Sequence, residues 1–256
     1  MMNLIRLEFG KLFRLNSLRL SLLVLAIFPI LWAYAPGIFK TYGFYVVSAF
    51  QVPALSLLSS MEFLLPLLVA IASAELLGLE MSHGTLPTVL LRPVSRSQWL
   101  IAKVIVAILY PFLLLAFFFL VSLLVGAPLG YGSFVGGTGL GEGGLLGEGV
   151  MASGVAFAEI LRAYVIAGFS LIPISLLAIL FTVIFMNVAG GALATLTVLI
   201  LMQLLVIFPW LEPFLLTTQL SAYLTPLGMW RALALIALYG AMFAALSVVL
   251  FERKDI

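Results

Sequence analysis

Six long apolar runs divide this chain, and each is long enough to cross a lipid bilayer as a helix. A transmembrane α-helix needs about 20 predominantly apolar residues. The chain is 64% hydrophobic and only 9% charged, whereas a soluble domain carries about 25% charged residues. We therefore predict an all-α polytopic membrane helix bundle that forms a single transmembrane domain over residues 1–256. Its six transmembrane helices are expected near Leu18–Ala35, Leu55–Leu79, Leu100–Val125, Ile160–Phe185, Ala189–Trp210 and Met229–Phe251.

Two positions within these runs predict breaks. The polar and small residues around Asn187–Gly191 separate the fourth run from the fifth, and one uninterrupted helix there would exceed the bilayer thickness, so we expect a turn. Pro66 lies inside the second run, where its missing N–H and its ring are expected to kink the helix.

The basic residues predict the orientation of the six helices. With the N-terminus inside, nine of the twelve lysines and arginines fall in cytoplasmic segments and three fall outside. Cytoplasmic loops carry an excess of such residues, so both termini are predicted to be cytoplasmic. The nine are Arg6, Lys11, Arg14, Arg19, Arg92, Arg96, Lys103, Arg253 and Lys254; the other three are Lys40, Arg162 and Arg231.

Residues 1–17 are predicted to form an amphipathic interfacial helix. Asn3, Arg6 and Arg14 fall on one helical stripe, and Ile5 and Phe9 lie roughly opposite. Such a helix lies in the headgroup plane with its basic face toward anionic lipid or a partner. The alternative is a positive leader that only sets the topology. No small-residue cleavage site follows, so a cleavable signal is not expected.

Two connections on the predicted external side differ in composition. In residues 126–154, twelve of 29 residues are glycine, and we expect a flexible loop because so few side chains can be buried. Its G-x-G-x-x-G at Gly139, Gly141 and Gly144 lacks the βαβ context of a dinucleotide site. The segment Trp210–Gly228 contains two prolines and is predicted to be either a short interfacial helix pair or a loop.

The usual signatures of catalysis are missing. The one Gly-Lys pair, Gly10-Lys11, has Ile5 where a P-loop needs its first glycine and Leu12 where it needs Ser or Thr. There is no cysteine, His83 is the single histidine, and neither H-E-x-x-H nor G-x-S-x-G occurs. No catalytic residue, metal site or nucleic-acid partner is predicted.

Two acids in the second run are candidates for a translocation path. Glu62 lies about 10 Å into the predicted helix, and Glu75 approaches its cytoplasmic end. An ionisable residue at membrane depth costs several kcal/mol unless it faces water, a bundle interior or a partner. The alternative places Glu62 near the outer headgroups and leaves Glu75 solvated. Thirteen positions apart, the two carboxylates do not share a helical face.

Residues 80–99 form the predicted cytoplasmic loop between the second and third helices. Gly84-Thr85 is expected to end the second helix, and Arg92-Pro93 to end a short leucine-rich helix that follows. Ser95 is predicted to cap the third helix. A short helix held between two membrane helices would move both when pushed, which is the form of a coupling element.

This loop resembles that of the permease subunits of type-2 ABC exporters. The residues that carry the resemblance are Glu80, Gly84-Thr85-Leu86, Val89-Leu90-Leu91, Pro93-Val94-Ser95-Arg96 and Lys103. The resemblance implies a six-helix permease domain that pairs with a second permease copy, as a homodimer or a heterodimer, and docks a separate ABC ATPase subunit. ATP and Mg²⁺ would then bind to the partner ATPase and not to this chain.

From the resemblance, the residues expected to couple this chain to the ATPase are Glu80, Gly84, Thr85, Leu86, Arg92, Pro93 and Arg96. The protein is then expected in the cell's inner (cytoplasmic) membrane. Two other readings stay open, an ion-driven secondary carrier and a membrane assembly factor that transports nothing. Few charges line the helices, so the cargo could be lipid-like, a peptide or a hydrophobic drug, or the subunit could do mechanical work on an external partner.

Overall fold

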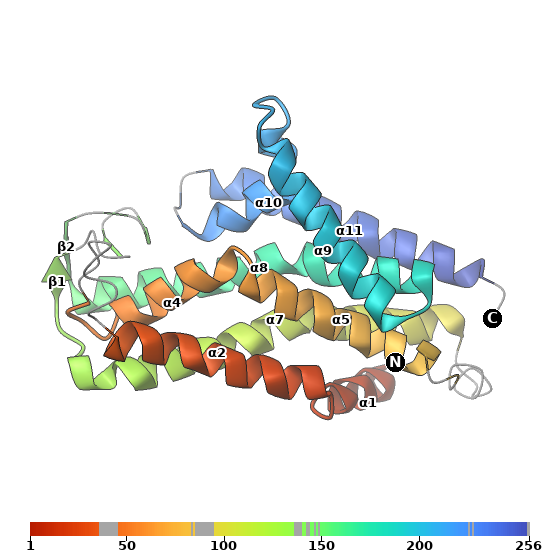
Figure 1. Cartoon of the computed structure of the whole chain (residues 1–256), viewed down its shortest axis with the longest axis horizontal. Coiled ribbons are helices and arrows are strands. Elements are labelled where there is room, and N and C mark those ends of the chain that lie inside the picture. Colours follow the sequence, from red (N-terminus) through yellow and green to blue (C-terminus); the bar gives the residue numbers. More distant parts are fainter. Residues whose placement is uncertain are drawn as a thin grey trace.

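The structure is a computed structural model that describes residues 1–35, 46–82, 84, 95–135, 140–141, 144–145, 147, 149–224, 226 and 228–254. Six helices in these ranges are long and apolar enough to cross a membrane, and Figure 1 shows them as one elongated bundle. They are α2 (Asn16–Tyr34), α5 (Leu64–Ser82), α7 (Arg96–Gly126), α8 (Ser153–Phe185), α9 (Val188–Leu205) and α11 (Met229–Glu252). The prediction of an all-α bundle with six apolar helices is confirmed.

The second crossing is broken into two helices. The helix α4 (Gln51–Met61) leads into α5, and the break falls at Glu62 and Phe63. Proline clashes with the carbonyl four residues before it, and the residue four before Pro66 is Glu62, so the predicted kink lies one turn ahead of the proline. The crossing also begins earlier than the predicted Leu55, because the Gln51 side chain accepts hydrogen bonds from the backbone N–H groups of residues 47 and 48.

A two-residue turn joins α8 to α9, as the sequence predicts. Met186 adopts a left-handed conformation with φ of 57°. The Asn187 side chain then caps α9 by accepting a hydrogen bond of 2.6 Å from the Gly190 N–H. A Cβ atom at Gly191 would lie 2.0 Å from Thr182 Oγ1, so the two helices can approach this closely only with glycine there.

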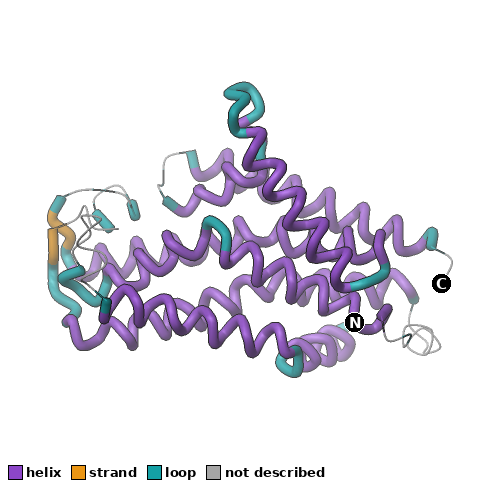
Figure 2. Tube along the Cα trace, in the orientation of Figure 1, coloured by secondary structure: helices purple, strands orange, loops and turns teal. Residues whose placement is uncertain are grey.

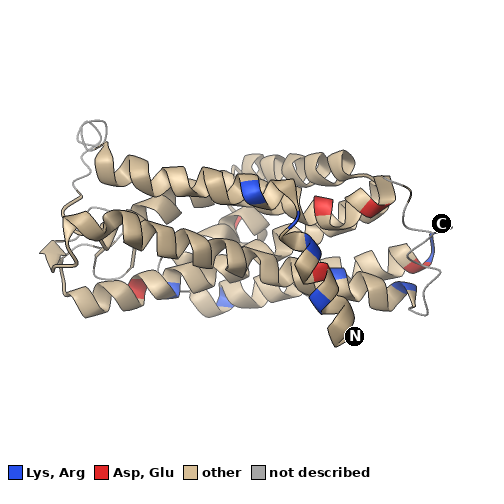
Figure 3. Cartoon of the chain, turned by 90° about the horizontal axis from the view of Figure 1, so that it is seen from below, with Lys and Arg blue, Asp and Glu red and all other residues tan. Residues whose placement is uncertain are grey.

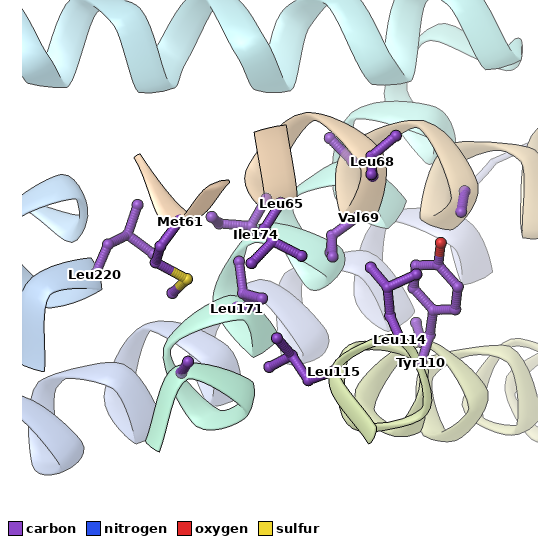
Figure 4. Close-up of a cluster of buried hydrophobic side chains, with 14 of the residues drawn as sticks. Met61, Leu65, Leu68, Val69, Tyr110, Leu114, Leu115, Leu171, Ile174 and Leu220 are labelled. Atoms are coloured by element: carbon purple, nitrogen blue, oxygen red, sulfur yellow. The ribbon is translucent and has the colours of Figure 1, made fainter. Parts of the chain in front are cut away.

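The hydrophobic core is centred on α8, which packs against α5, α7, α9 and α11. Figure 4 shows Leu65 and Val69 of α5 meeting Leu171 and Ile174 of α8, with Leu115 of α7 below them. The outward sides of α2, α9 and α11 carry many exposed large apolar residues. This distribution fits a bundle whose outer surface contacts lipid.

The two ends of the bundle differ in secondary structure (Figure 2). Both termini lie at one end, with the N-terminal helix α1 (Met2–Leu12), the end of α5 and the α8–α9 turn; we call this the charged end. The other end, the ribbon end, contains the strands β1 (Phe134–Val135) and β2 (Val150–Met151), which pair antiparallel. The short helix η1 (Ala127–Leu129) links α7 to this ribbon.

Parts of the predicted external connections are ordered by burial. Within the glycine-rich loop, Phe134, Leu140, Leu145 and Met151 are buried. The sequence predicted a flexible loop with few buried side chains, and the described part of the loop differs from that prediction because these four side chains pack into the core. The proline-containing connection forms three short helices, in line with the helical alternative. They are η2 (Glu212–Phe214), α10 (Leu216–Gln219) and η3 (Leu220–Tyr223).

Candidate functional site

A buried ion pair joins α1 to α7 at the charged end. The side chain of Lys103 is 0% exposed and that of Glu8 is 1% exposed, and Lys103 Nζ lies 2.8 Å from Glu8 Oε2. Lys103 also donates a hydrogen bond of 2.7 Å to the carbonyl of Leu76 in α5. Burying a charge is costly unless it is paired and hydrogen-bonded, and both groups meet that condition here.

Two further residues extend this pair to four charges. Lys11 Nζ lies 2.5 Å from Glu8 and 2.6 Å from Glu80, and Lys103 Nζ lies 3.2 Å from the same Glu80 oxygen. Burial lowers the pKa of Lys11, but its hydrogen bonds with Glu8 and Glu80 outweigh this effect and raise the pKa above its ordinary value. These four residues, which we call the ion cluster, have balanced formal charges and tie together α1, α5 and α7.

Aromatic rings cover the ion cluster on the α11 side. Lys103 Nζ lies 4.9 Å from the centroid of the Trp99 ring, a cation–π distance. Trp99 stacks on Phe251, with ring centroids 5.3 Å apart. The ion cluster is therefore also connected to the last membrane helix.

Hydrogen bonds of Lys254, which follows α11, connect that helix to α7 and α8 at the same end. Arg96 donates a hydrogen bond of 3.0 Å to the Lys254 carbonyl. Lys254 Nζ in turn donates to the carbonyls of Val183 and Ile184, at 2.6 and 2.7 Å, and so satisfies the last turn of α8. Figure 3 shows most of the charged residues in the half of the bundle that contains both termini.

Three of the predicted coupling residues, Glu80, Gly84 and Arg96, lie among the residues that the structure describes. Glu80 belongs to the ion cluster and Arg96 to the C-terminal contact. Ser95 caps α7, as predicted, by accepting a hydrogen bond of 3.2 Å from the Gln98 N–H. Gly84 has a φ of +65° and no neighbour within 4 Å of an added Cβ. The other predicted coupling residues, Thr85, Leu86, Arg92 and Pro93, lie outside the described residues, together with His83.

The predicted interfacial helix α1 has a protein-facing side that sequence reasoning missed. Asn3, Arg6 and Arg14 are exposed, as expected of a basic outer face. Glu8 and Leu12 are buried on the inner face. Two residues in the sequence could have indicated this contact. Glu8 is an acid one helical turn before Leu12 on an otherwise apolar face, and Lys103 is a lysine inside the third apolar run.

The structure does not bring Glu62 and Glu75 together. Glu75 is partly buried nearer the charged end, close enough to Tyr110 of α7 for an electrostatic interaction with its hydroxyl. Glu62 lies at the break between α4 and α5 and lines a cavity of about 240 Å³. We call this space the Glu62 cavity.

The Glu62 cavity lies between the second crossing, α9 and the α10–η3 segment. Gln203, Thr217, Ser221 and Tyr223 contribute its other polar groups. A smaller space of about 30 Å³ adjoins it and shares Glu62, Gln203 and Thr217. Among the residues that the structure describes, no group of three histidines, cysteines or acids could hold a metal ion.

Comparison with families of known proteins connects this chain to one of them. A family model described as ABC-2 family transporter protein matches residues 4–167, which is more than half of the chain. The matched region runs from α1 into α8 and contains the whole ion cluster and Glu62. A search of curated proteins found no match.

Proposed function

Because the chain belongs to the ABC-2 transporter family, we propose that it is the permease subunit of an ATP-driven exporter and that it forms the translocation path. It is a multi-pass membrane protein and a component of a transport system. A separate ABC ATPase would supply the energy, and ATP and Mg²⁺ would bind there, because this chain has no P-loop. The chain itself would then catalyse no reaction.

The ion cluster is the observation that carries this proposal. Its residues lie in α1, at the end of α5 and near the start of α7, and the predicted coupling segment connects α5 to α7. A force applied to that segment by an ATPase would reach two membrane helices and α1 at once, since charged groups hold the three together. The nucleotide cycle would in this way change the packing of the bundle.

The charge distribution supports a cytoplasmic location for the charged end. Eight of the ten lysines and arginines that the structure describes belong to this half, and the other two are Arg162 and Arg231. Because basic residues favour the cytoplasmic side, both termini would be cytoplasmic and the ribbon end external. The protein would act in the inner membrane as a dimer with a second permease copy.

Copurification tests the proposed partner. The tagged chain would be isolated from its native membranes in mild detergent and its companions identified by mass spectrometry. We expect a stoichiometric P-loop protein. Recovery of the chain alone, under conditions that keep a known ABC complex intact, would contradict the proposal and favour an ion-driven carrier.

A charge reversal then tests coupling in the reconstituted complex. Arg96→Glu is expected to lower transport-linked ATP hydrolysis at least threefold while membrane insertion stays normal, because it disrupts the contact with the C-terminal residues at the start of α7. Arg231→Glu, at the opposite end of α11 from the Lys254 contact, is the matched control and should leave hydrolysis unchanged. Equal rates for Arg96→Glu and the unmodified complex would remove the coupling claim.

A further inference from the structure

Glu62 lines a cavity and, unlike Glu8 and Glu80 of the ion cluster, has no ion-pair partner among the described residues. The salt bridges among these residues join Glu8, Glu80 and Glu159 to basic side chains, and Glu62 takes part in none. Glu62 is exposed at the α4–α5 break, and ionisable residues among membrane helices mark substrate or ion paths. The uncompensated carboxylate gives the Glu62 cavity a negative charge.

The depth of the cavity places it near one surface of the membrane. Gln203, which lines it, is two residues from the end of α9, so it lies about 22 Å along the helix from Val188 at the other end. Glu62 sits at the same level, at the α4–α5 break. A ligand could therefore enter this cavity from the headgroup region on the side of the ribbon end.

One wall of the cavity has a hydrogen-bonding group that no described residue of the protein uses. Thr217 Oγ1 is buried and has no hydrogen-bond partner among the described residues. A buried hydroxyl without a partner costs free energy, and this one lines the same space as Glu62 and Gln203. The three polar groups are thus available to a molecule bound in the cavity.

Tyr223 contributes an aromatic residue to the lining of the cavity. It lines the space beside Glu62 and is 5% exposed. Burial, and to a lesser extent the charge of Glu62, raise the pKa of its phenol, so the ring stays neutral. Arg162 holds this residue by a hydrogen bond of 3.2 Å to its carbonyl. A carboxylate next to an aromatic ring is the combination that recognises ammonium groups.

The remainder of the wall is apolar. Leu58, Met61, Leu220 and Leu224 line the cavity, and Figure 4 shows Met61 and Leu220 adjacent at the edge of the core. Such a surface favours a ligand whose body is hydrophobic. An anionic headgroup would be repelled, because Glu62 gives the cavity a negative charge and none of the described residues that line it is basic.

We propose that the Glu62 cavity binds a hydrophobic organic monocation, a protonated amine or quaternary ammonium with a compact apolar body. Glu62 and the Tyr223 ring would bind the charged group, and the leucines and Met61 would surround the apolar body. The inference that such a cation is the transporter's cargo rests on the proposed function. The inference that the cavity binds such a cation depends only on the residues that line the cavity.

Equilibrium dialysis of the purified chain in maltoside detergent tests the site directly. The probe is radiolabelled benzyltriethylammonium, and benzenesulfonate serves as an anionic competitor. We expect saturable binding that Glu62→Gln weakens at least tenfold, because this variant keeps the shape of the side chain and removes its charge. Glu212→Gln removes an exposed acid from the nearby η2 and should bind within twofold of the unmodified chain. Benzenesulfonate should not compete.

A second variant distinguishes loss of the binding site from unfolding of the chain. Thr217→Val removes the unpartnered hydroxyl and should weaken the binding of protonated benzyldiethylamine, whose N–H can donate to this hydroxyl, about threefold. It should leave the binding of benzyltriethylammonium, which has no N–H, and the melting temperature unchanged. Absence of saturable binding to the unmodified chain, or equal affinity in Glu62→Gln, would overturn the proposal.

The assay contains no ATPase, so its failure leaves the permease proposal standing. Stimulation of ATP hydrolysis by the same cation in the reconstituted complex tests whether the bound cation is cargo. Stimulation that disappears in Glu62→Gln supports this assignment. Saturable binding without stimulation contradicts the cargo assignment and leaves the binding site intact.

Discussion

The two acids near the two ends of α5, Glu62 and Glu80, have opposite surroundings. Glu80, near the end of α5, lies 2.6 Å from Lys11 and 3.2 Å from Lys103. Glu62, at the start of the same helix, lines a cavity among apolar side chains and takes part in none of the ion pairs of the described residues. Paired charges hold helices together, whereas an unpaired acid leaves its electrostatic attraction available to a ligand. The comparison assigns cohesion to the charged end and recognition to the Glu62 cavity.

The largest expected effect comes from removing one buried charge of the ion cluster. Lys103→Met leaves Glu8 buried with only the half-exposed Lys11 beside it. Removing one partner of a buried pair costs about 3–5 kcal/mol, and we expect a loss of this size in the free energy of unfolding in mixed micelles.

The double variant Glu8→Gln with Lys103→Met is the control for that loss. It removes both charges, so most of the stability should return. Equal destabilisation of the single and double variants would show that the packing of Lys103 matters and not its charge.

A smaller effect is expected from an added methyl group at the α8–α9 turn. Gly191→Ala places a Cβ against Thr182, and overpacking of this kind costs about 1–3 kcal/mol. Gly154→Ala, in the first turn of α8 at the ribbon end, meets no atom within 4 Å and should stabilise by about 0.5–1 kcal/mol. Melting temperatures should therefore shift in opposite directions; a shared direction would contradict the close contact.

Substitution of Lys11, the half-exposed member of the ion cluster, should reduce the free energy of unfolding by a smaller amount. Lys11 has 47% of its side chain exposed, so solvent screens its ion pairs, and Lys11→Met should cost less than about 1 kcal/mol.

The pH dependence of that cost has a defined sign. The folded-state pKa of Lys11 is raised above its ordinary value of 10.5, so the stability it contributes is present below the unfolded pKa and is lost as the pH rises through the folded value. The stability difference between the unmodified chain and Lys11→Met should be constant from pH 7 to 9 and shrink above pH 10.5. A difference that grows with pH would oppose this assignment.

The smallest effect on stability is expected at Glu62. Because this acid is exposed and has no described ion-pair partner, Glu62→Gln should change the free energy of unfolding by less than about 0.5 kcal/mol. Glu8→Gln, with the same chemistry at the buried pair, should cost several times more. Similar losses for the two variants in chemical denaturation would end the distinction between cohesion and recognition.

The helices could be predicted from the sequence because lipid requires long apolar runs, and these can be read along the chain. The α8–α9 turn and the kink caused by Pro66 were also predictable, since both depend on residues close in sequence. The start of the second crossing at Gln51 could not be predicted from the sequence. The Gln51 cap depends on its side chain turning back to the backbone at residues 47 and 48.

The site was predictable only where its parts are neighbours in sequence. Ser95 could be assigned as the cap of α7 from local pattern. The partners of Lys103 lie 95 and 23 positions away, at Glu8 and Glu80, and no periodicity relates such distant residues. Likewise Glu62 stood out as an acid in an apolar run, but Tyr223 and Thr217 reach it only through the folding of the α10–η3 segment. The coupling roles of Glu80, Gly84 and Arg96 stay predictions, as do those of Thr85, Leu86, Arg92 and Pro93, which lie outside the described residues.

The tight turn between α8 and α9 has a mechanical consequence. The close contacts of Gly191 with Thr182 and of Gly78 with Val188 fix one end of α9. Only four of the 18 residues of α9 are buried, against 19 of the 33 residues of α8. A helix fixed at one end and loosely held along its length acts as a lever. A tilt of about 10° about Val188 would displace Gln203, about 22 Å away at 1.5 Å per residue, by about 4 Å. A small rearrangement at the charged end would thus be magnified at the wall of the Glu62 cavity and would change its width by about the diameter of a methyl group.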